Sequence, residues 1–202
     1  MENEVITCIK GRRSVRSYTD IAITKENVDT IITAGKYAPS AENRQPWKFI
    51  IISDKKTIDD LSKEVKQQIH NVMAHRRKWK RRFPEASNNE TAFFLNTIAS
   101  SQQDIIFFNA PLIILIITDN LVFNDESCAA AAQNMMIAAW SLGIGSCWIG
   151  FAKFLELNID VMHRLGVPEG YHISACIVFG YAEHVSKASL RKPTADIIRW
   201  IE

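Results

Sequence analysis

The stretch Cys128–Leu142 constrains the fold more than any other part of this 202-residue chain. It is rich in alanine, follows an acidic segment and stops at Gly143, and these signals together predict a helix. Small residues fall on nearly all of its sides, so neighbouring elements can approach it closely. We therefore expect a central, buried helix, with Met135 and Met136 as core residues.

Short apolar runs elsewhere predict buried strands. Six consecutive apolar residues, Leu112–Ile117, follow Pro111, a length that suits a strand and falls far short of a membrane span. Similar runs occupy residues 48–52 and 173–181. Helices are expected over 3–10, from Thr24 onward, over 59–83 and over 155–165, whereas 95–108 fits neither type. Strands and helices mix without regular alternation, which favours an α+β fold in one domain, residues 1–202.

Composition and cysteine spacing exclude several classes of protein. Hydrophobic residues make up 47% of the chain and charged residues 23%, as in globular proteins with a full core. The four cysteines form no C-x-x-C pair and no H-E-x-x-H motif is present, so we expect reduced thiols, no disulfide and no metal site. The acidic start Met1–Glu4 leads into no apolar signal segment, and we expect a cytoplasmic protein without a membrane anchor.

The first candidate site follows the first predicted helix and consists of Arg12, Arg13, Ser14 and Arg16. Guanidinium groups bind phosphate oxygens in a bidentate manner, and a serine hydroxyl with backbone amides completes such a site. Three arginines within five residues therefore predict an anion-binding site at a helix end. The alternative is a solvated helix end whose arginines simply face water.

The second candidate site is the polar loop Ala38–Trp47, between a predicted helix and a predicted strand. A proline near each end fixes the backbone φ, so the groups between them are held in place for a ligand. Ser40, Asn43 and Gln45 offer both hydrogen-bond donors and acceptors, which suits the edge of a heteroaromatic ring system. We expect the Trp47 side chain to anchor the loop in the core. The alternative is a purely structural loop.

Taken together, these segments resemble the nitroreductase family of FMN-dependent oxidoreductases. The resemblance rests on both candidate sites and, in the family's order, on Gln133–Ala139, Leu142–Ser146, Ile149–Gly150, Leu165–Pro168, Phe179–Tyr181 and Arg191–Pro193. It covers the chain from end to end. The implied fold is a nitroreductase-like α+β fold, with a central, mostly antiparallel sheet flanked by helices, in an intertwined homodimer.

The resemblance also implies roles for the matched residues. Those expected to bind the FMN phosphate and ribityl chain are Arg12, Arg13, Ser14 and Arg16, with Arg191 as a further phosphate contact at or near the subunit interface. Those expected to line the isoalloxazine ring are Pro39, Ser40, Ala41 and Asn43 and, near N5 through their backbone, Ile149 and Gly150. No protein acid or base is assigned, because the cofactor carries the chemistry.

The implied activity is an NAD(P)H-dependent reduction in a ping-pong cycle. A nicotinamide cofactor and then a nitroaromatic, quinone or flavin-like acceptor occupy one open flavin face in turn. Residues from about 60 to 108 are expected to form a variable cover over the active site, and those from about 185 to 202 an extension toward the dimer partner. Apolar residues at the C-terminal end agree with burial in such an interface, namely Ile197, Ile198, Trp200 and Ile201.

The acceptor is left open by the sequence. Ala182 follows Gly180–Tyr181 where the family often has proline, and residues 63–108 match no subgroup motif. The absence of tyrosine from residues 38–170 disfavours the deiodinase branch of the family. One alternative function is that of an FMN enzyme that reduces or dehydrogenates a single small metabolite. Another is that of a flavin-binding or nucleic-acid-binding regulator.

The regulator alternative depends on a basic segment, residues 75–83, in which six Lys or Arg residues surround Trp79. Its positive charge is local, because the net charge of the whole chain is only +2. The segment can attract the phosphates of NADPH or an anionic acceptor, form a solvated helical face, or bind nucleic acid. No recognised nucleic-acid module surrounds it, so a nucleic-acid partner is not expected.

Overall fold

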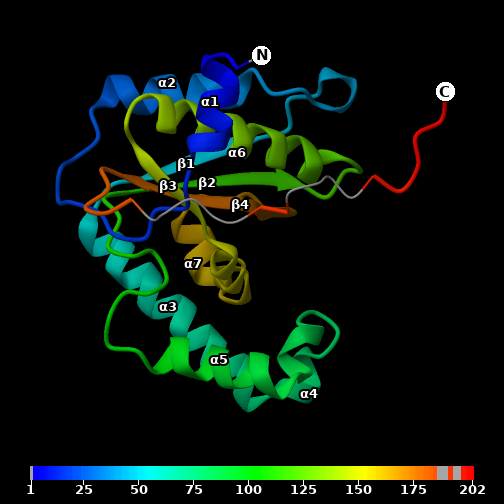
Figure 1. The fold of residues 1–202 in the computed structure, drawn as a ribbon. Coiled ribbons are helices and arrows are strands. Elements are labelled where there is room, and N and C mark those ends of the chain that lie inside the picture. The colour runs from blue at the N-terminus through cyan, green and yellow to red at the C-terminus, as the bar shows by residue number, and fades with distance from the viewer. Residues whose placement is uncertain (1, 186–190, 193–196) are drawn as a thin grey trace.

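A four-stranded sheet lies between two groups of helices (Figure 1). The computed structural model describes residues 2–185, 191–192 and 197–202. The helices on one side are α1 (Glu4–Gly11), α2 (Lys25–Lys36) and α6 (Asn124–Ser141). Those on the other side are α3 (Lys55–Ala74), α4 (Arg76–Trp79), α5 (Asn89–Ser100) and α7 (Ile159–Arg164). Within the described residues, no helix has both the length and the apolar character needed to cross a membrane.

The sheet has the strand order β1-β2-β4-β3, and every neighbouring pair is antiparallel. Its strands are β1 (Lys48–Ile52), β2 (Leu112–Asp119), β3 (Gly145–Trp148) and β4 (Tyr171–Gly180). Short 3-10 helices complete the fold, namely η1 (Ala41–Asn43), η2 (Pro84–Ser87) and η3 (Gly150–Leu157). The predicted α+β fold with a central antiparallel sheet is therefore confirmed.

The sequence of strand β2 is continuously apolar because both faces of the strand are buried. Successive side chains of a strand point to opposite faces of the sheet. Ile113 and Leu115 therefore pack against the core formed with α3 and α5, whereas Ile114 and Ile116 pack against α2 and α6. All four side chains are completely buried. The prediction of a buried strand at 112–117 is confirmed.

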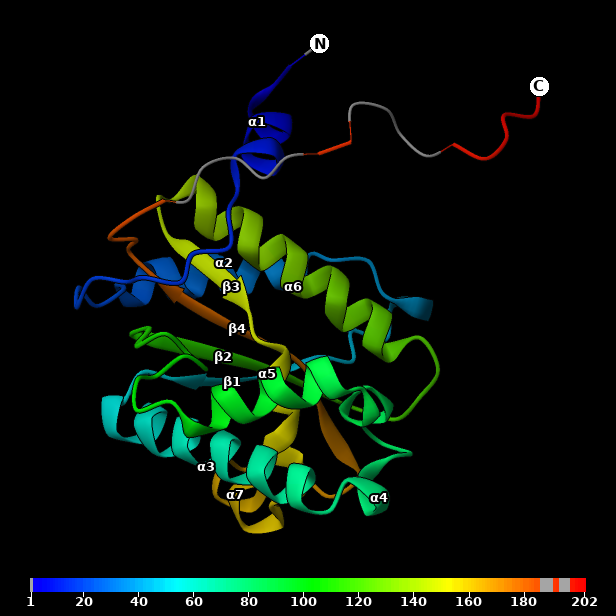
Figure 2. The ribbon, with the colours of Figure 1, turned by 60° about the horizontal axis from the view of Figure 1, so that its bottom comes forward.

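Helix α6 lies across the sheet and packs against α2 and β4 (Figure 2). Met135 and Met136 are buried in its core-facing side, as expected, and Gly143 ends it with a left-handed φ of 74°. Helix α2 approaches so closely that a Cβ on Gly35 would lie 2.8 Å from Met135 Cγ. One side that includes Ala129 and Gln133 is exposed, however. The expectation of close neighbours on nearly all sides is therefore wrong for this face within one chain.

The segment between β1 and β2 differs most from the sequence prediction. The single helix expected over 59–83 is divided at His75 into α3 and α4. Pro84 then begins η2, and Asn88, expected in a turn, caps α5 by accepting the backbone N–H groups of Glu90 and Thr91. Residues 95–108, ambiguous in the sequence, combine the second half of α5 with a turn. Local capping therefore decides these boundaries.

Gly145 gives a test of how tightly the first site packs against the sheet. Val15 donates its N–H to the carbonyl O of Ser146 at 3.0 Å, and a Cβ on Gly145 would lie 2.6 Å from Val15 Cγ2. We expect Gly145→Ala to lower the free energy of unfolding by about 1–3 kcal/mol in urea denaturation, because this packing leaves no room for a methyl group. Adding Val15→Ala should recover only part of this loss, because the Val15 Cβ at 2.8 Å remains, whereas Gly150→Ala, with no atom within 4 Å of its Cβ, should change stability little. Equal losses at both glycines would contradict the steric cause.

Candidate functional site

The segment after α1 runs along the edge of β3 and brings three of the four predicted residues together. Ser14 forms a parallel bridge with Ser146, next to Cys147 on β3. Burial raises the pKa of the Cys147 thiol, and Arg16, the Ser14 hydroxyl and Arg12 oppose this shift. Charges and hydroxyls act in this way only over short distances. Arg12, Ser14 and Arg16 therefore lie near one point on β3, at Cys147.

Two polar atoms near this point lack partners within the described part of the chain. They are Arg12 Nη1 and Ser146 Oγ, both buried and without a hydrogen bond. A buried donor without a partner destabilises a protein, and a charged one does so more strongly. An anion placed beside Arg12 would accept from this guanidinium in a charge-assisted hydrogen bond. The residues present therefore fit a phosphate-bearing ligand.

Arg13 has a different environment from its neighbours. Its Nη1 donates to the carbonyl oxygens of Lys10, Gly11 and Arg12 at 2.7, 2.8 and 2.9 Å. These groups lie at the C-terminal end of α1, where backbone carbonyls have no partner in the helix. One end of the Arg13 guanidinium therefore caps α1, which leaves its remaining N–H groups for a ligand.

A cleft of about 400 Å³ opens beside this cluster. It contains three of the predicted residues, Arg16, Ile149 and Gly150. Ile149 donates its backbone N–H to the carbonyl O of Cys176 at 2.8 Å, so this amide is already paired in the sheet. Gly150 begins η3, where N–H groups have no partner inside the helix, and a Cβ there would meet no atom within 4 Å. Unlike Ile149, Gly150 therefore offers the cleft an open stretch of backbone.

Aromatic side chains line the same cleft, and the sequence analysis did not identify them as site residues. They are Phe94, Phe108, Trp148 and Phe151. The Phe94 and Phe151 rings lie 6.2 Å apart, and the Arg16 guanidinium carbon lies 5.9 Å from the centre of the Phe108 ring. Phe94 belongs to α5, within the expected cover. Trp148 and Phe151 flank Ile149–Gly150 in the sequence, a signal that could have identified them.

The loop Ala38–Trp47 has a strained and well-determined conformation. Glu42, Asn43 and Gln45 have φ values of 53°, 53° and 48°, which non-glycine residues seldom adopt. Ser40 Oγ accepts the backbone N–H of Gln45 at 3.0 Å and fixes the turn. Trp47 is buried, as predicted, whereas Pro39 and Asn43 are exposed and Ser40 and Ala41 are half-buried. Such strain is typical of loops that position a ligand.

The loop and the arginine cluster lie at opposite ends of α6. At one end, the Ala41 N–H donates to Ser127 Oγ at 3.3 Å. At the other end, a Cβ on Gly11 would lie 3.0 Å from Trp140 Nε1. Ser127 and Trp140 are 13 residues apart in α6, about 20 Å at the rise of an α-helix. One chain therefore does not bring the two predicted parts of the site together.

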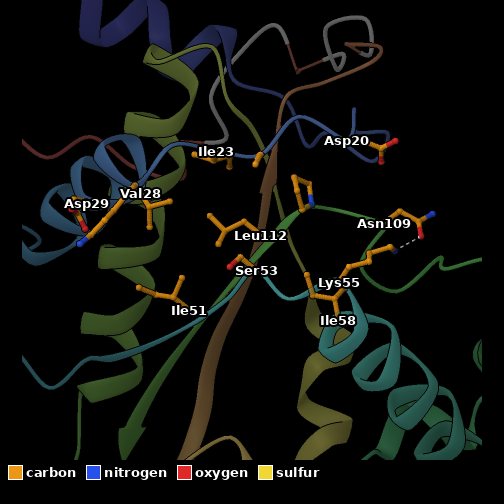
Figure 3. Close-up of a pocket in the computed structure, with 13 residues that line it drawn as sticks. Asp20, Ile23, Val28, Asp29, Ile51, Ser53, Lys55, Ile58, Asn109 and Leu112 are labelled. Carbon is orange, nitrogen blue, oxygen red and sulfur yellow. Dashed lines mark hydrogen bonds between the residues drawn. The ribbon is translucent and has the colours of Figure 1, made fainter.

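The remaining predicted residue and a second, larger cavity lie apart from this cleft. Arg191 is exposed and does not line it. A larger cavity of about 620 Å³ lies between α2, β1 and the start of α3 (Figure 3). Ile23, Ile51 and Leu112 give it apolar walls, and Asp20 and Lys55 lie at its rim. It contains none of the predicted site residues.

Two arginines of the basic segment 75–83 are used to hold the segment in place. Arg76 donates to the carbonyl oxygens of Ala86 and Ser87, both at 2.9 Å. Arg82 forms an ion pair with Glu156 of η3 at 2.6 Å. The stacked Phe83 and Phe154 rings, 4.6 Å apart, add a second link to η3. Arg77, Lys80 and Arg81 are exposed, so the surface charge is smaller than the sequence suggests.

Comparisons with known proteins identify the family of this chain. The model of the nitroreductase family matches residues 9–181. A protein of Archaeoglobus fulgidus, provisionally named NADH dehydrogenase/NAD(P)H nitroreductase, is 28% identical over 178 residues, 88% of this chain and 85% of its own length. The crystal structure of a nitroreductase with bound FMN from Bacteroides fragilis is 27% identical, covers 100% of both chains and has a TM-score of 0.80. This chain belongs to the nitroreductase family.

Proposed function

We propose that the protein is an FMN-dependent oxidoreductase that uses NAD(P)H to reduce nitroaromatic, quinone or flavin-like acceptors. The observation that carries the proposal is the buried Arg12 Nη1, which has no hydrogen-bond partner among the described residues, near a cleft that exposes the Gly150 backbone. The first offers a place for a phosphate, and the second lets a flat ring approach the protein. The nitroreductase of Bacteroides fragilis binds FMN, which supports the same cofactor here.

In this proposal, Arg12 and Ser14 bind the FMN phosphate, with Arg13 through the N–H groups that do not cap α1. Arg16 extends from the cluster into the cleft, where its fixed positive charge stabilises negative charge on the pyrimidine ring. The Gly150 N–H would be the donor nearest the reacting nitrogen of the bound flavin. Bound FMN supplies the transfer of hydride from a nicotinamide to an acceptor. The chain binds, orients and shields the reactants.

A single cleft supports alternate binding of donor and acceptor. Its aromatic side chains, Phe94, Phe108, Trp148 and Phe151, offer flat apolar surfaces to planar molecules and keep water away from the reacting ring. With FMN bound in the cleft, the one open face of its ring would accept one planar molecule at a time. We therefore propose a ping-pong cycle in which the oxidised nicotinamide leaves before the acceptor binds.

The site is completed by a second copy of the chain in an intertwined homodimer. The arginine cluster and the loop Ala38–Trp47 lie about 20 Å apart along α6, so one cofactor contacts both only when they come from different subunits. Pro39, Ser40, Ala41 and Asn43 then line the ring from the partner. The exposed face of α6 at Ala129 and Gln133 offers a surface of small side chains for this contact.

The extension from about residue 185 to 202 joins the same interface in this proposal. Its described apolar residues are exposed, namely Ile197, Ile198, Trp200 and Ile201. Residues 197–202 stand clear of the folded body in both views (Figures 1 and 2). Burial of these side chains against a partner would place Arg191 at the subunit interface, where it adds a phosphate contact. The free cysteines of the chain suit a reducing compartment such as the cytoplasm.

The test of this function is an anaerobic stopped-flow experiment on the FMN-loaded protein. We expect NADH or NADPH to bleach the flavin absorbance, and a nitroaromatic, a quinone or free FMN to restore it. Steady-state rates at several donor concentrations should give parallel double-reciprocal lines, as ping-pong kinetics require. A protein that takes up no FMN would rule out the proposal. Bleaching without reoxidation by any of the three acceptors would favour an enzyme specific for one metabolite.

A further inference from the structure

The turn Asp104–Asn109 has a conformation that requires support from a side chain. Phe108 and Asn109 have consecutive left-handed φ values of 58° and 52°, and neither residue is glycine. The Asp104 carboxylate supplies that support. Its Oδ1 accepts the N–H groups of Ile106 at 3.1 Å and Phe107 at 3.0 Å, and its Oδ2 accepts the N–H of Asn109 at 2.9 Å.

The same carboxylate connects the turn to α3. The Ser62 hydroxyl, on a buried face of α3, donates to Asp104 Oδ1 at 2.6 Å. Ile106 and Phe107 are completely buried between this helix and the sheet. Four donors therefore converge on one carboxylate, and the turn cannot rotate as a unit without losing them.

The two strained residues point in different directions. Asn109 lies at the rim of the larger cavity, where Lys55 Nζ donates to its Oδ1 at 3.1 Å (Figure 3). Phe108 lines the cleft on the other side, with its ring centre 5.9 Å from the Arg16 guanidinium carbon. This distance is within the range of a cation–π interaction. The left-handed turn is what allows neighbouring residues to reach these separate places.

The Arg16 guanidinium has the Phe108 ring as its aromatic neighbour. Its side chain is exposed, and within the described residues no hydrogen bond or ion pair fixes its guanidinium. A long side chain without a fixed partner samples many rotamers, and this conformational entropy is lost when a ligand binds. An aromatic face beneath the guanidinium reduces that loss.

We infer that Asp104 is a positioning residue for the flavin site, acting through Phe108 to hold the Arg16 guanidinium in the cleft. The inference rests on the proposed function, in which Arg16 contacts FMN. Asp104 itself touches neither the cleft nor the cluster. Its effect on the cofactor passes through the turn and the Phe108 ring.

The test measures FMN dissociation constants by fluorescence titration of the dimeric, full-length protein. We expect Asp104→Ala to weaken FMN binding about fivefold to tenfold. This range combines the loss of a cation–π contact with the greater rotamer freedom of the Arg16 side chain before FMN binds. Asp104→Asn keeps an acceptor for the Oδ1 donors and loses the one for Asn109, so it should give a smaller loss. Phe108→Leu should match Asp104→Ala, and Phe108→Tyr, which keeps the ring, should stay within about twofold of the wild type.

Two further measurements separate positioning from a purely structural role. In an Arg16→Ala background, Asp104→Ala should change the FMN dissociation constant less than about twofold, because the residue it positions is gone. Asp54→Ala is the matched control, since Asp54 caps α3 through the N–H of Thr57 at 2.8 Å and its hydroxyl at 2.6 Å and does not line the cleft. It should lower the melting temperature and leave FMN affinity unchanged.

The outcomes distinguish this inference from the proposed function. An unchanged FMN affinity in Arg16→Ala would show that Arg16 does not contact the cofactor, and the proposed site would be wrong. A loss in Arg16→Ala together with no change in Asp104→Ala, or the same change in both backgrounds, would overturn the positioning role alone. Hydrogen exchange of the 104–110 amides in cofactor-free protein should rise in Asp104→Ala, and unchanged protection would also contradict it.

Discussion

Replacing both Arg12 and Arg16 by alanine is expected to abolish FMN binding at micromolar concentrations of the cofactor. Each charge-assisted hydrogen bond contributes about 1.5–3 kcal/mol, so two are worth about 3–6 kcal/mol. This corresponds to a loss of about a hundredfold to ten-thousandfold in affinity. Arg12 should contribute most, because its Nη1 is buried without a partner. The measurement is a fluorescence titration of FMN into the cofactor-free protein.

The matched control for this variant is Arg77→Ala with Arg81→Ala. Both side chains are exposed on the basic segment 75–83, and their removal changes the net charge by the same amount. FMN affinity should stay within about twofold of the wild type, since exposed charges at this distance are screened by salt. Full flavin occupancy in the Arg12→Ala/Arg16→Ala variant would show that the phosphate lies elsewhere.

The sequence predicts well those parts of the fold that depend on burial or on hydrogen bonds between residues close together in the chain. Leu112–Ile117 is apolar at every position because both faces of β2 are covered, and the length of this run suits a strand better than a helix. Thr24 and Gly143 mark helix ends through local hydrogen bonding and backbone freedom. Each of these signals depends on a few neighbouring residues.

The site is harder to predict because its geometry depends on distant partners. The sequence groups Arg13 with Arg12 and Arg16, but the end of α1 offers Arg13 three carbonyl oxygens. It treats the Ile149 and Gly150 amides alike, but β4 uses the first. Whether these donors are free for a ligand depends on where a helix ends and on which strands pair. Residue type alone does not encode them.

The aromatic cleft shows the same limit. Phe94 reaches it because Asn88 caps α5 and sets the phase of that helix, and Phe108 reaches it because Asp104 shapes the next turn. The sequence of residues 95–108 carries no single period that reveals either contact. These two contacts therefore depend on capping side chains rather than on a hydrophobic pattern.

The separation of the two predicted site segments by α6 gives the most direct test of a shared site. A chain with Arg12→Ala/Arg16→Ala keeps an intact loop, and a chain with Ser40→Ala/Asn43→Ala keeps an intact arginine cluster. Homodimers of either chain should lack tightly bound FMN. A mixed dimer, purified through two different tags, should bind one FMN, because its intact cluster faces the intact loop of the other chain.

The number of FMN molecules per mixed dimer decides between a shared site and a site within one chain. Absorbance of the released cofactor gives this number directly, and a wild-type dimer carrying both tags should give two. If one chain formed each site alone, both chains of the mixed dimer would be defective and no FMN would be retained. The gain from none to one requires the loop and the cluster to come from different subunits, the arrangement that the distance of about 20 Å along α6 favours.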